Sequence, residues 1–381
     1  MRIDSKLPHV GTTIFTVMTS LARELGAINL AQGFPDYDPP ERLKQLVEEH
    51  VRAGHNQYAH MAGVLELRQA IAGKLATSYG RALDPENEVT ITLGATEAIF
   101  SAISGLVHPG DDVIMLDPSY DSYAPAVILA GGRPIHVPML PPDFKVDWQR
   151  VRDAVTPRLR MIMINTPHNP TGSIIPPHEL DVLADILEGT DAFVLADEVY
   201  EHMVYDGAVH ASIVAHERLF ERGIAVFSFG KSMHATGWRV GYAVARPEIT
   251  REIRRVHQFN TFSIAAPLQH AIADFLREEP EHNARLSAFY ERKRDLFLEA
   301  LQGSRFRYSP SAGTYFQLLD FREISQGTDV EFADRLVREV GVASIPVSPF
   351  YEDAPALSVV RFCFAKNDST LERAAERLRR I

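Results

Sequence analysis

The sequence predicts an α/β fold with three layers, in which helices cover both faces of a mainly parallel sheet of about seven strands. Between residues 89 and 245, short runs of β-branched and other apolar residues alternate with segments of helical periodicity. Several of these runs are apolar throughout, which is typical of strands buried on both faces. Beyond residue 285 helical and strand-like segments are mixed, which predicts a smaller α+β domain.

Apolar periodicity locates each element along the chain. Helices are expected first at 12–25, 41–52 and 64–79, with irregular stretches at 28–37 and 56–63. Strands are expected at 89–93, 112–116, 135–137, 160–164, 192–196, 224–227 and 240–245. Further helices are expected at 96–106, 122–129, 247–258, 265–276 and 281–301, and the last strands at 314–319 and 358–364. We predict an N-terminal segment, 1–45, that joins the small domain, a large domain, 46–284, and a small domain, 285–381.

The composition argues against several classes of protein. The formal net charge of -11 argues against a nucleic-acid partner, because phosphate backbones are bound by clustered lysine and arginine. No apolar run approaches the roughly 18 residues that a membrane helix needs, so no membrane association is expected. The single cysteine, Cys363, excludes an intramolecular disulfide and a cysteine-based metal cluster, and no metal site is expected. With no signal-peptide pattern in the first ten residues, a cytoplasmic location is expected.

A lysine lies between the predicted strands at 224–227 and 240–245. Lys231 is preceded by Ser228 and followed by Arg239, and we expect all three on one loop. One interpretation is an imine between Lys231 and an aldehyde cofactor whose phosphate the serine and arginine hold. Arg239 would then also lower the pKa of the lysine amine. This segment alone is explained equally well by an ordinary loop lysine.

Polar residues follow other predicted strands at the same edge of the sheet, where ligands of such sheets bind. Asp197 ends one strand, and a carboxylate there can keep a pyridine nitrogen protonated; Tyr200 follows three residues later. Asn169 lies in a loop stiffened by two prolines and a glycine. A helix cap for the aspartate and a turn role for the asparagine are the alternatives.

Three further features are candidates for binding. Ala95 and Thr96 open a helix directly after a strand, where backbone N–H groups bind phosphate, although Thr96 alone would be read as a helix cap. Tyr120 follows another strand and is placed either to stack on a planar ring or to pack in the core. Arg361 lies inside an apolar strand and requires an anion, either a substrate carboxylate or a structural acid.

Taken together, these segments resemble the fold-type I aminotransferases that use pyridoxal 5'-phosphate. The likeness is greatest to the branch that contains bacterial methionine aminotransferases and the kynurenine and glutamine transaminases. It extends over nearly the whole chain, and the spacing of Ser228, Lys231 and Arg239 is its most specific part. The matching segments are 29–36, 56–63, 94–97, 117–125, 165–172, 197–201, 228–241, 313–316 and 359–364.

The resemblance implies a role for each candidate residue. Lys231 binds the cofactor covalently and later moves a proton, Asp197 pairs with the pyridine nitrogen, and Tyr120 stacks on the ring. Asn169 and Tyr200 contact the ring oxygen. The phosphate is held by a group that we call the phosphate cup: Ala95, Thr96, Ser228 and Arg239.

The resemblance also implies a homodimer with shared active sites. Tyr58 reaches the phosphate of the neighbouring subunit. Gly33, Asn169 and Arg361 bind the substrate carboxylate, and Phe15 covers the site.

The implied reaction is a ping-pong transfer of an amino group between amino acids and 2-oxo acids. Between Arg255 and Arg277 there is no lysine or arginine, and Phe259, Phe262 and Ile264 lie there instead. An apolar pocket favours methionine or an aromatic amino acid, with glutamine or kynurenine as further candidates. The alternative is a C–S β-lyase acting on cysteine conjugates or cystathionine. A nicotinamide dehydrogenase is disfavoured because no Gly-x-Gly-x-x-Gly follows a strand, and a DNA-binding regulator because family-like sequence begins by about residue 10 in an acidic chain.

Overall fold

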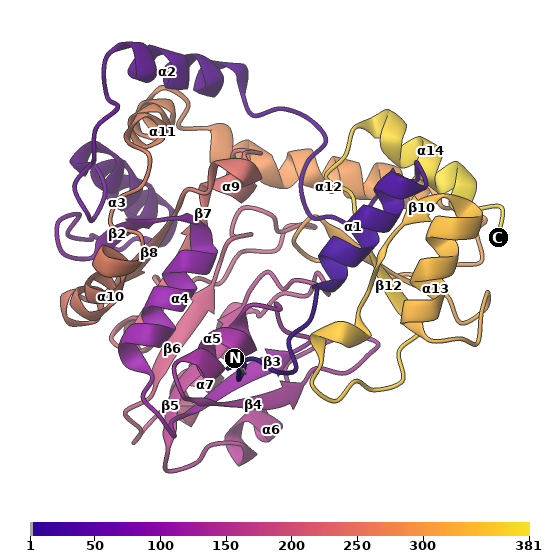
Figure 1. Ribbon diagram of the computed structural model, residues 1–381, viewed down its shortest axis with the longest axis horizontal. Coiled ribbons are helices and arrows are strands. Elements are labelled where there is room, and N and C mark those ends of the chain that lie inside the picture. Colours follow the sequence, from indigo (N-terminus) through magenta and orange to yellow (C-terminus); the bar gives the residue numbers. More distant parts are fainter. Residues whose placement is uncertain (1–2) are drawn as a thin grey trace.

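A computed structural model of the protein describes residues 3–381 and is organised around a seven-stranded sheet (Figure 1). The strands lie in the order β2 (Val89–Thr92), β8 (Gly241–Ala245), β7 (Gly223–Ser228), β6 (Phe193–Asp197), β5 (Leu159–Asn165), β3 (Asp112–Asp117) and β4 (Arg133–Pro138). Only β8 is antiparallel, and it pairs with β2 and β7. The predicted mainly parallel α/β sheet is therefore confirmed.

Two hydrophobic cores form because successive side chains of a strand point to opposite faces of the sheet. In β3, Val113 and Met115 pack into one core, whereas Ile114 and Leu116 pack into the other. The first face is covered by α4 (Gly94–Leu106), α5 (Tyr123–Leu129) and α10 (Pro247–Asn260). The second is covered by α2 (Glu41–Arg52), α3 (Leu65–Tyr79), α6 (Trp148–Asp153), α7 (Pro177–Ile186), α8 (Glu217–Phe220) and α11 (Ala266–Glu278).

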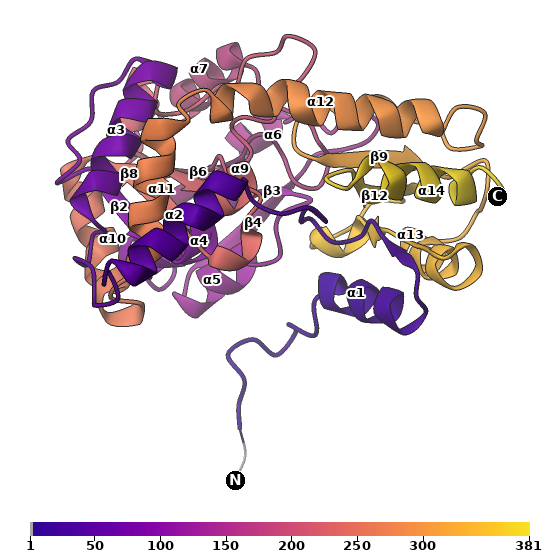
Figure 2. The same cartoon turned by 90° about the horizontal axis from the view of Figure 1, so that it is seen from above.

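A third core joins the two ends of the chain. Its members include Met18 and Leu30 from the N-terminal side and Phe297 and Phe362 from the C-terminal side. The helices around it are α1 (Ile14–Glu24), α13 (Asp329–Arg335), η2 (Leu336–Val340) and α14 (Asp368–Leu378). The long helix α12 (His282–Ala300) runs from the large sheet toward these elements (Figure 2).

Two small sheets complete this part of the molecule. The strands β11 (Ile345–Pro346), β12 (Val359–Cys363) and β9 (Phe316–Asp320) form an antiparallel sheet in that order. The short strand β1 (Ile28–Asn29) pairs in parallel with β10 (Val342–Ala343), which ties the N-terminal segment to the C-terminal elements. Cys363 is buried in β12. The domain boundaries near residues 45 and 285 stay predictions.

One local prediction was wrong. Lys231 does not lie on a loop but in a short helical turn, α9 (Phe229–Ser232), which is followed by the 3-10 turn η1 (Thr236–Trp238). The Met233 N–H donates to the Phe229 carbonyl at 2.8 Å, and the Phe229 N–H donates to the Val240 carbonyl at 3.1 Å. Among the helices of residues 3–381, none has the combined length and apolarity that crossing a membrane requires.

Candidate active site

A cavity at one edge of the sheet brings together nine of the predicted site residues. They are Ala95, Thr96, Tyr120, Asn169, Asp197, Tyr200, Ser228, Lys231 and Arg239, joined by Ile99, Tyr123, Asn165 and Val199. The parallel strands β3, β5, β6 and β7 end at this edge. Antiparallel β8 begins there, and Arg239 lies two residues before its first residue. β2 also ends there, just before Ala95 and Thr96, so the topology assembles the cavity from six separate strand ends.

Lys231 lines this cavity and is half-buried. Its Nζ lies 5.5 Å from the ring centre of Tyr200 and 5.7 Å from that of Tyr315. Burial, and next the positive charge of Arg239, lower the pKa of the Lys231 amine to about 8. Near neutral pH a much larger fraction of this amine is therefore neutral, and hence nucleophilic, than of an ordinary lysine.

Asp197 is buried at the end of β6. The hydroxyl of Tyr123 donates to its Oδ2 at 2.5 Å, and the N–H of Val199 donates to Oδ1 at 3.3 Å. Burial raises the pKa of the Asp197 carboxyl, and the bond from Tyr123 opposes that rise. Burial together with the nearby carboxylate raises the pKa of the Tyr123 hydroxyl far above its ordinary value, so this hydroxyl keeps its proton and remains the donor.

Asn165 and Asn169 connect Asp197 with Arg361. The Asn165 amide donates to the Asp197 carbonyl at 2.8 Å and accepts from the Asn169 N–H at 2.7 Å. Arg361 Nη1 then donates to Asn169 Oδ1 at 2.7 Å. One continuous chain of hydrogen bonds thus runs from the end of β6 to the centre of β12.

Arg361 is a buried cation without an acidic partner among residues 3–381. Its Nη2 donates to the Ala31 carbonyl at 2.8 Å, its guanidinium lies over the Phe316 ring at 3.9 Å, and its Nε is buried without a hydrogen-bond partner. Burial lowers the pKa of Arg361 to about 10. A buried guanidinium with an unused donor is suited to a carboxylate ligand.

The residues predicted as the phosphate cup meet where α4 begins. Gly94 has a φ of 71°, and a Cβ at this position would lie only 2.6 Å from Arg239 Nη2. The close approach requires glycine and sets the guanidinium beside the first N–H groups of α4. In the described part of the chain Arg239 forms no ion pair and donates to the Thr236 carbonyl at 3.1 Å. Thr96 and Arg239 are exposed, so this end of the cavity is open.

Four predicted residues lie outside the cavity lining. Arg361 and Phe15 lie next to it, since the guanidinium is 5.1 Å from the Phe15 ring and the rings of Phe15 and Tyr120 are 6.4 Å apart. Gly33 is held nearby because its carbonyl accepts from the Tyr315 hydroxyl at 2.6 Å. Tyr58 is 85% exposed and packs against Phe262 at 5.4 Å, so it does not contribute to the cavity of its own chain.

Three polar residues in or beside the cavity were not predicted as site residues. Asn165 and Tyr123 had a recognisable signal, because Asn165 ends a strand as Asp197 does, and Tyr123 follows Tyr120 at helical spacing. Tyr315 lies in 313–316, a segment of the family resemblance, but no role was expected for it; its ring centre lies 5.7 Å from Lys231 Nζ.

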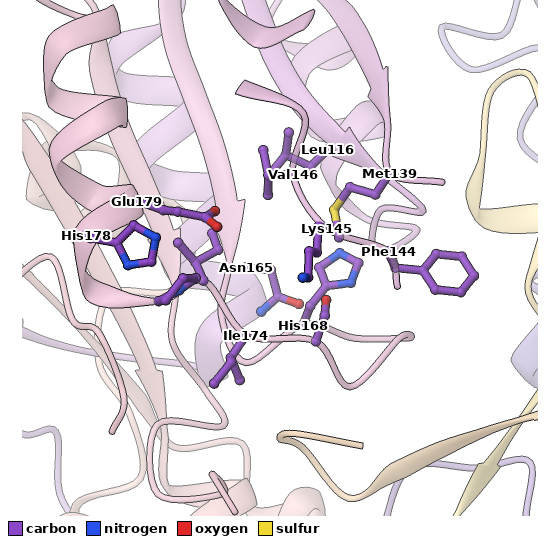
Figure 3. Close-up of a pocket in the computed structure, with 13 residues that line it drawn as sticks. Leu116, Met139, Phe144, Lys145, Val146, Asn165, His168, Ile174, His178 and Glu179 are labelled. Atoms are coloured by element: carbon purple, nitrogen blue, oxygen red, sulfur yellow. The ribbon is translucent and has the colours of Figure 1, made fainter. Parts of the chain in front are cut away.

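Asn165 also lines a second cavity (Figure 3). It is lined by Leu116, Met139, Phe144, Lys145, Val146, Asn165, His168, Ser173, Ile174, Ile175, Pro176, His178 and Glu179. Asn165 is the one residue that lines both cavities. Because neither Lys231 nor Arg361 faces it, this second cavity is not the candidate active site.

Comparisons with known proteins agree with this geometry. The family model for aminotransferase class I and II matches residues 26–378. The chain is 50% identical over 377 residues to the methionine aminotransferase of Escherichia coli K12, covering 99% of this chain and 98% of that protein. It is 31% identical over 409 residues to kynurenine–oxoglutarate transaminase 1 of the rat, covering 98% of this chain and 97% of that one.

A solved structure gives the same result. An Escherichia coli protein for which a methionine aminotransferase function was identified superposes with a TM-score of 0.98 at 49% identity, over 100% of both chains. The match to the family model and the extent of these identities are far above what chance similarity produces. The chain therefore belongs to the family of class I and II aminotransferases.

Proposed function

We propose that this aminotransferase uses pyridoxal 5'-phosphate to move the amino group of a neutral amino acid, methionine first among them, to a 2-oxo acid in a ping-pong reaction. The observation that carries the proposal is the cavity in which Lys231, Asp197 and Arg239 meet at one edge of the sheet. The relative that is 50% identical is named methionine aminotransferase, and the rat relative acts on kynurenine by its name. These relatives give no support to the C–S β-lyase alternative.

The side chains present fit this cofactor. The amine of Lys231, with a pKa of about 8, suits an aldehyde, and the buried carboxylate of Asp197 suits a pyridine nitrogen. The guanidinium of Arg239, which has no acidic partner in the described residues, suits a phosphate at the start of α4. When bound, pyridoxal 5'-phosphate supplies the aldehyde that accepts the amino group and a ring that withdraws electrons from the substrate Cα.

The surrounding residues orient the cofactor and move the proton. Tyr120 stacks on the ring, and the side chains of Asn169 and Tyr200 donate to its oxygen. The phosphate cup holds the other end: Ala95, Thr96, Ser228 and Arg239. Lys231 Nζ would accept the proton of the substrate Cα and hold it for return, and a pKa of about 8 suits an amine that both accepts and donates a proton.

Arg361 is proposed to bind the substrate carboxylate with the help of Gly33 and Asn169. Its Nε has no partner, and each Nη group makes one hydrogen bond, so N–H donors remain for the two carboxylate oxygens. Phe15 lies over the guanidinium and covers the site from the N-terminal side. Arg361 is carried by the smaller group of elements and Asn169 by the larger one. We therefore propose that the substrate lies between two domains, 46–284 and 285–381, with 1–45 belonging to the smaller.

The proposed active unit is a homodimer. Thr96 and Arg239 leave one end of the cavity open in a single chain. Tyr58 is 85% and Phe259 is 86% exposed, which is unusual for large aromatic side chains. A second copy would cover both and would bring its Tyr58 to the phosphate. Ile264 is buried in its own chain, so only Phe259 and Phe262 remain free to line a neighbour's pocket.

Specificity for neutral side chains is proposed because no second cation is offered to a substrate from residues 256–276. Phe259 and Phe262 supply apolar surface there. Such a pocket favours methionine and aromatic side chains and leaves a second carboxylate unpaired. The substrates are small dissolved molecules and the one cysteine is unpaired, so we propose a cytoplasmic location.

Half-reactions with single amino acids test this proposal. The protein loaded with pyridoxal 5'-phosphate is mixed with methionine, phenylalanine, glutamine, kynurenine or aspartate, and the cofactor absorbance is followed together with the oxo acid formed. Methionine is expected to give the highest second-order rate constant. The Arg361→Lys variant is expected to require more methionine for the same rate. Aspartate as the preferred donor would overturn the substrate class. Pyruvate from cystathionine as the main product would overturn the reaction.

A further inference from the structure

His257 is a fully buried residue of α10 that lies outside the cofactor cavity. Both of its ring nitrogens have partners. Nε2 is 3.0 Å from the Met61 carbonyl, and Nδ1 is 3.1 Å from both carboxylate oxygens of Glu97. A carbonyl oxygen only accepts, so Nε2 is a donor, and the second contact joins Nδ1 to the carboxylate. One imidazole thus connects two segments that are distant in sequence.

The Glu97 end of this connection holds the turn that forms the phosphate cup. Glu97 lies in the first turn of α4 with its carboxylate buried. One oxygen accepts from the Leu93 N–H at 3.2 Å, and the other accepts from the Ser101 hydroxyl at 2.5 Å. Gly94, Ala95 and Thr96 lie between Leu93 and Glu97 in the sequence. The bond from the Leu93 N–H to the Glu97 carboxylate therefore stabilises this turn. Its position determines where the free N–H groups of α4 point.

The Met61 end holds the segment that carries Tyr58. The Ser263 hydroxyl donates to the Ala59 carbonyl at 3.1 Å, and the Ile91 N–H donates to the Ala62 carbonyl at 3.0 Å. His257 adds the bond to the carbonyl between these two anchors. Segment 59–62 is therefore held by three bonds to different parts of the chain, and the bond from His257 links it through a side chain to Glu97, in the first turn of α4.

We propose that His257 is a positioning residue for the cofactor phosphate. Through Glu97 it holds the turn that carries Ala95 and Thr96 of the phosphate cup of its own subunit, and through Met61 it holds the segment that presents Tyr58 to the other subunit. A single buried side chain thereby connects phosphate ligands of both subunits. This inference rests on the proposed function, because it requires a bound phosphate and a second subunit.

Two conservative variants separate the two bonds. In His257→Asn the side-chain amide replaces Nδ1 and retains the contact with Glu97, whereas in His257→Gln it replaces Nε2 and retains the contact with Met61. The dissociation constants of pyridoxal 5'-phosphate and of pyridoxal, which has no phosphate, are measured for both. Each variant is expected to weaken the phosphorylated cofactor about tenfold or more and to leave pyridoxal within about twofold, because the lost bond acts on the phosphate alone.

The ³¹P resonance of the bound cofactor gives an independent readout. Its chemical shift is expected to move in both variants and to stay unchanged in a control, His270→Gln. His270 is a histidine of α11 whose ring packs on His50 and His55, away from Glu97 and Met61. If either variant fails to fold, Glu97→Gln, which keeps the side-chain volume, replaces it in the same comparison.

The possible results distinguish the role of His257 from the proposed function. Folded variants with unchanged cofactor affinity and an unchanged ³¹P shift would overturn the role of His257. Equal loss of pyridoxal 5'-phosphate and pyridoxal would also overturn it, because that result indicates general structural damage. A wild-type protein that binds no pyridoxal 5'-phosphate would overturn the proposed function itself, and the role of His257 with it.

Discussion

The Tyr123 hydroxyl and burial act on Asp197 in opposite directions. Burial raises the pKa of this carboxyl, while the hydrogen bond of 2.5 Å from Tyr123 stabilises the ionised form. A carboxylate can hold a proton on a pyridine nitrogen, whereas a carboxylic acid cannot. Tyr123 therefore controls how well Asp197 performs its proposed role.

The variant Tyr123→Phe removes this bond and leaves the ring in place. A hydrogen bond to a charged group contributes roughly 1.5–3 kcal/mol, which corresponds to a fall in kcat of about ten- to a hundredfold. KM is expected to change little, because Tyr123 does not contact Arg361. Steady-state kinetics with methionine measure both constants, and a kcat equal to that of the wild type would contradict this role.

The pKa of Lys231 predicts how the uptake of an aldehyde depends on pH. Only the neutral amine attacks, so the rate for the apo-protein with pyridoxal should rise through an apparent pKa near 8 and level off above it. Arg239 is the second cause of the low value, so Arg239→Gln should move the midpoint to higher pH. Stopped-flow absorbance measures the rate. A midpoint near the ordinary lysine value of about 10.4 would refute the argument.

At the scale of single elements, the start of α4 depends on a glycine. Gly94 has a φ of 71° and leaves no room for a Cβ beside Arg239. Gly80, at the end of α3, has the same φ of 71° but open space around it. Both positions require a positive φ, which favours glycine. Only at Gly94 would a Cβ also collide with a side chain, that of Arg239.

Gly94→Ala and Gly80→Ala should therefore have different consequences. Both variants should lose about 1–2 kcal/mol of the free energy of unfolding, because an L-residue is strained in the left-handed region. Only Gly94→Ala should also weaken the binding of pyridoxal 5'-phosphate, since its Cβ displaces Arg239 from the phosphate cup. Denaturant unfolding and cofactor titration separate the effects. Equal cofactor affinity in the two variants would be incompatible with this account.

The strands were predictable because their composition is dictated by burial. The apolar runs 161–164 and 192–196 are typical of strands that helices cover on both sides, and they fall largely within β5 and β6. The turn α9 was not predictable, because four residues are too few for a periodic pattern. The direction of β8 was also beyond the sequence, since strand pairing depends on tertiary contacts.

The residues of the candidate active site also fall into predictable and unpredictable ones. Asp197 and Asn169 follow strand ends, so their convergence at one edge was predictable from topology. Gly33 and Phe15 were expected from the family resemblance alone. Tyr315 and His257 act through contacts between segments remote in sequence, and no local pattern records such contacts. The sequence therefore predicted the residues at the strand ends better than the residues that hold them in place.

At the scale of the whole molecule, the proposed homodimer with shared active sites predicts complementation between two impaired variants. Lys231→Ala lacks the amine but keeps Tyr58, whereas Tyr58→Phe keeps the amine but lacks the phenol. In a mixed dimer, the site built on the Tyr58→Phe subunit contains its own Lys231 and Tyr58 of the Lys231→Ala subunit. One fully native site is thus restored.

Mixing the two purified variants under conditions of subunit exchange should raise the activity above that of Tyr58→Phe alone. The gain should follow the fraction of mixed dimers, measured by native mass spectrometry with one subunit carrying a tag. A control mixture of Tyr58→Phe with a double variant, Lys231→Ala and Tyr58→Phe, should give no gain. Activity that never exceeds Tyr58→Phe would indicate that Tyr58 serves only its own chain or no site at all.

Covalent trapping at Lys231 tests the central claim most directly. The protein is incubated with pyridoxal 5'-phosphate, reduced with borohydride and digested, and the peptides are identified by mass spectrometry. The account predicts one stoichiometric modification, located on Lys231 and absent from a folded Lys231→Ala variant. A folded wild-type protein whose Lys231 stays unmodified, or one modified at another lysine instead, would contradict it.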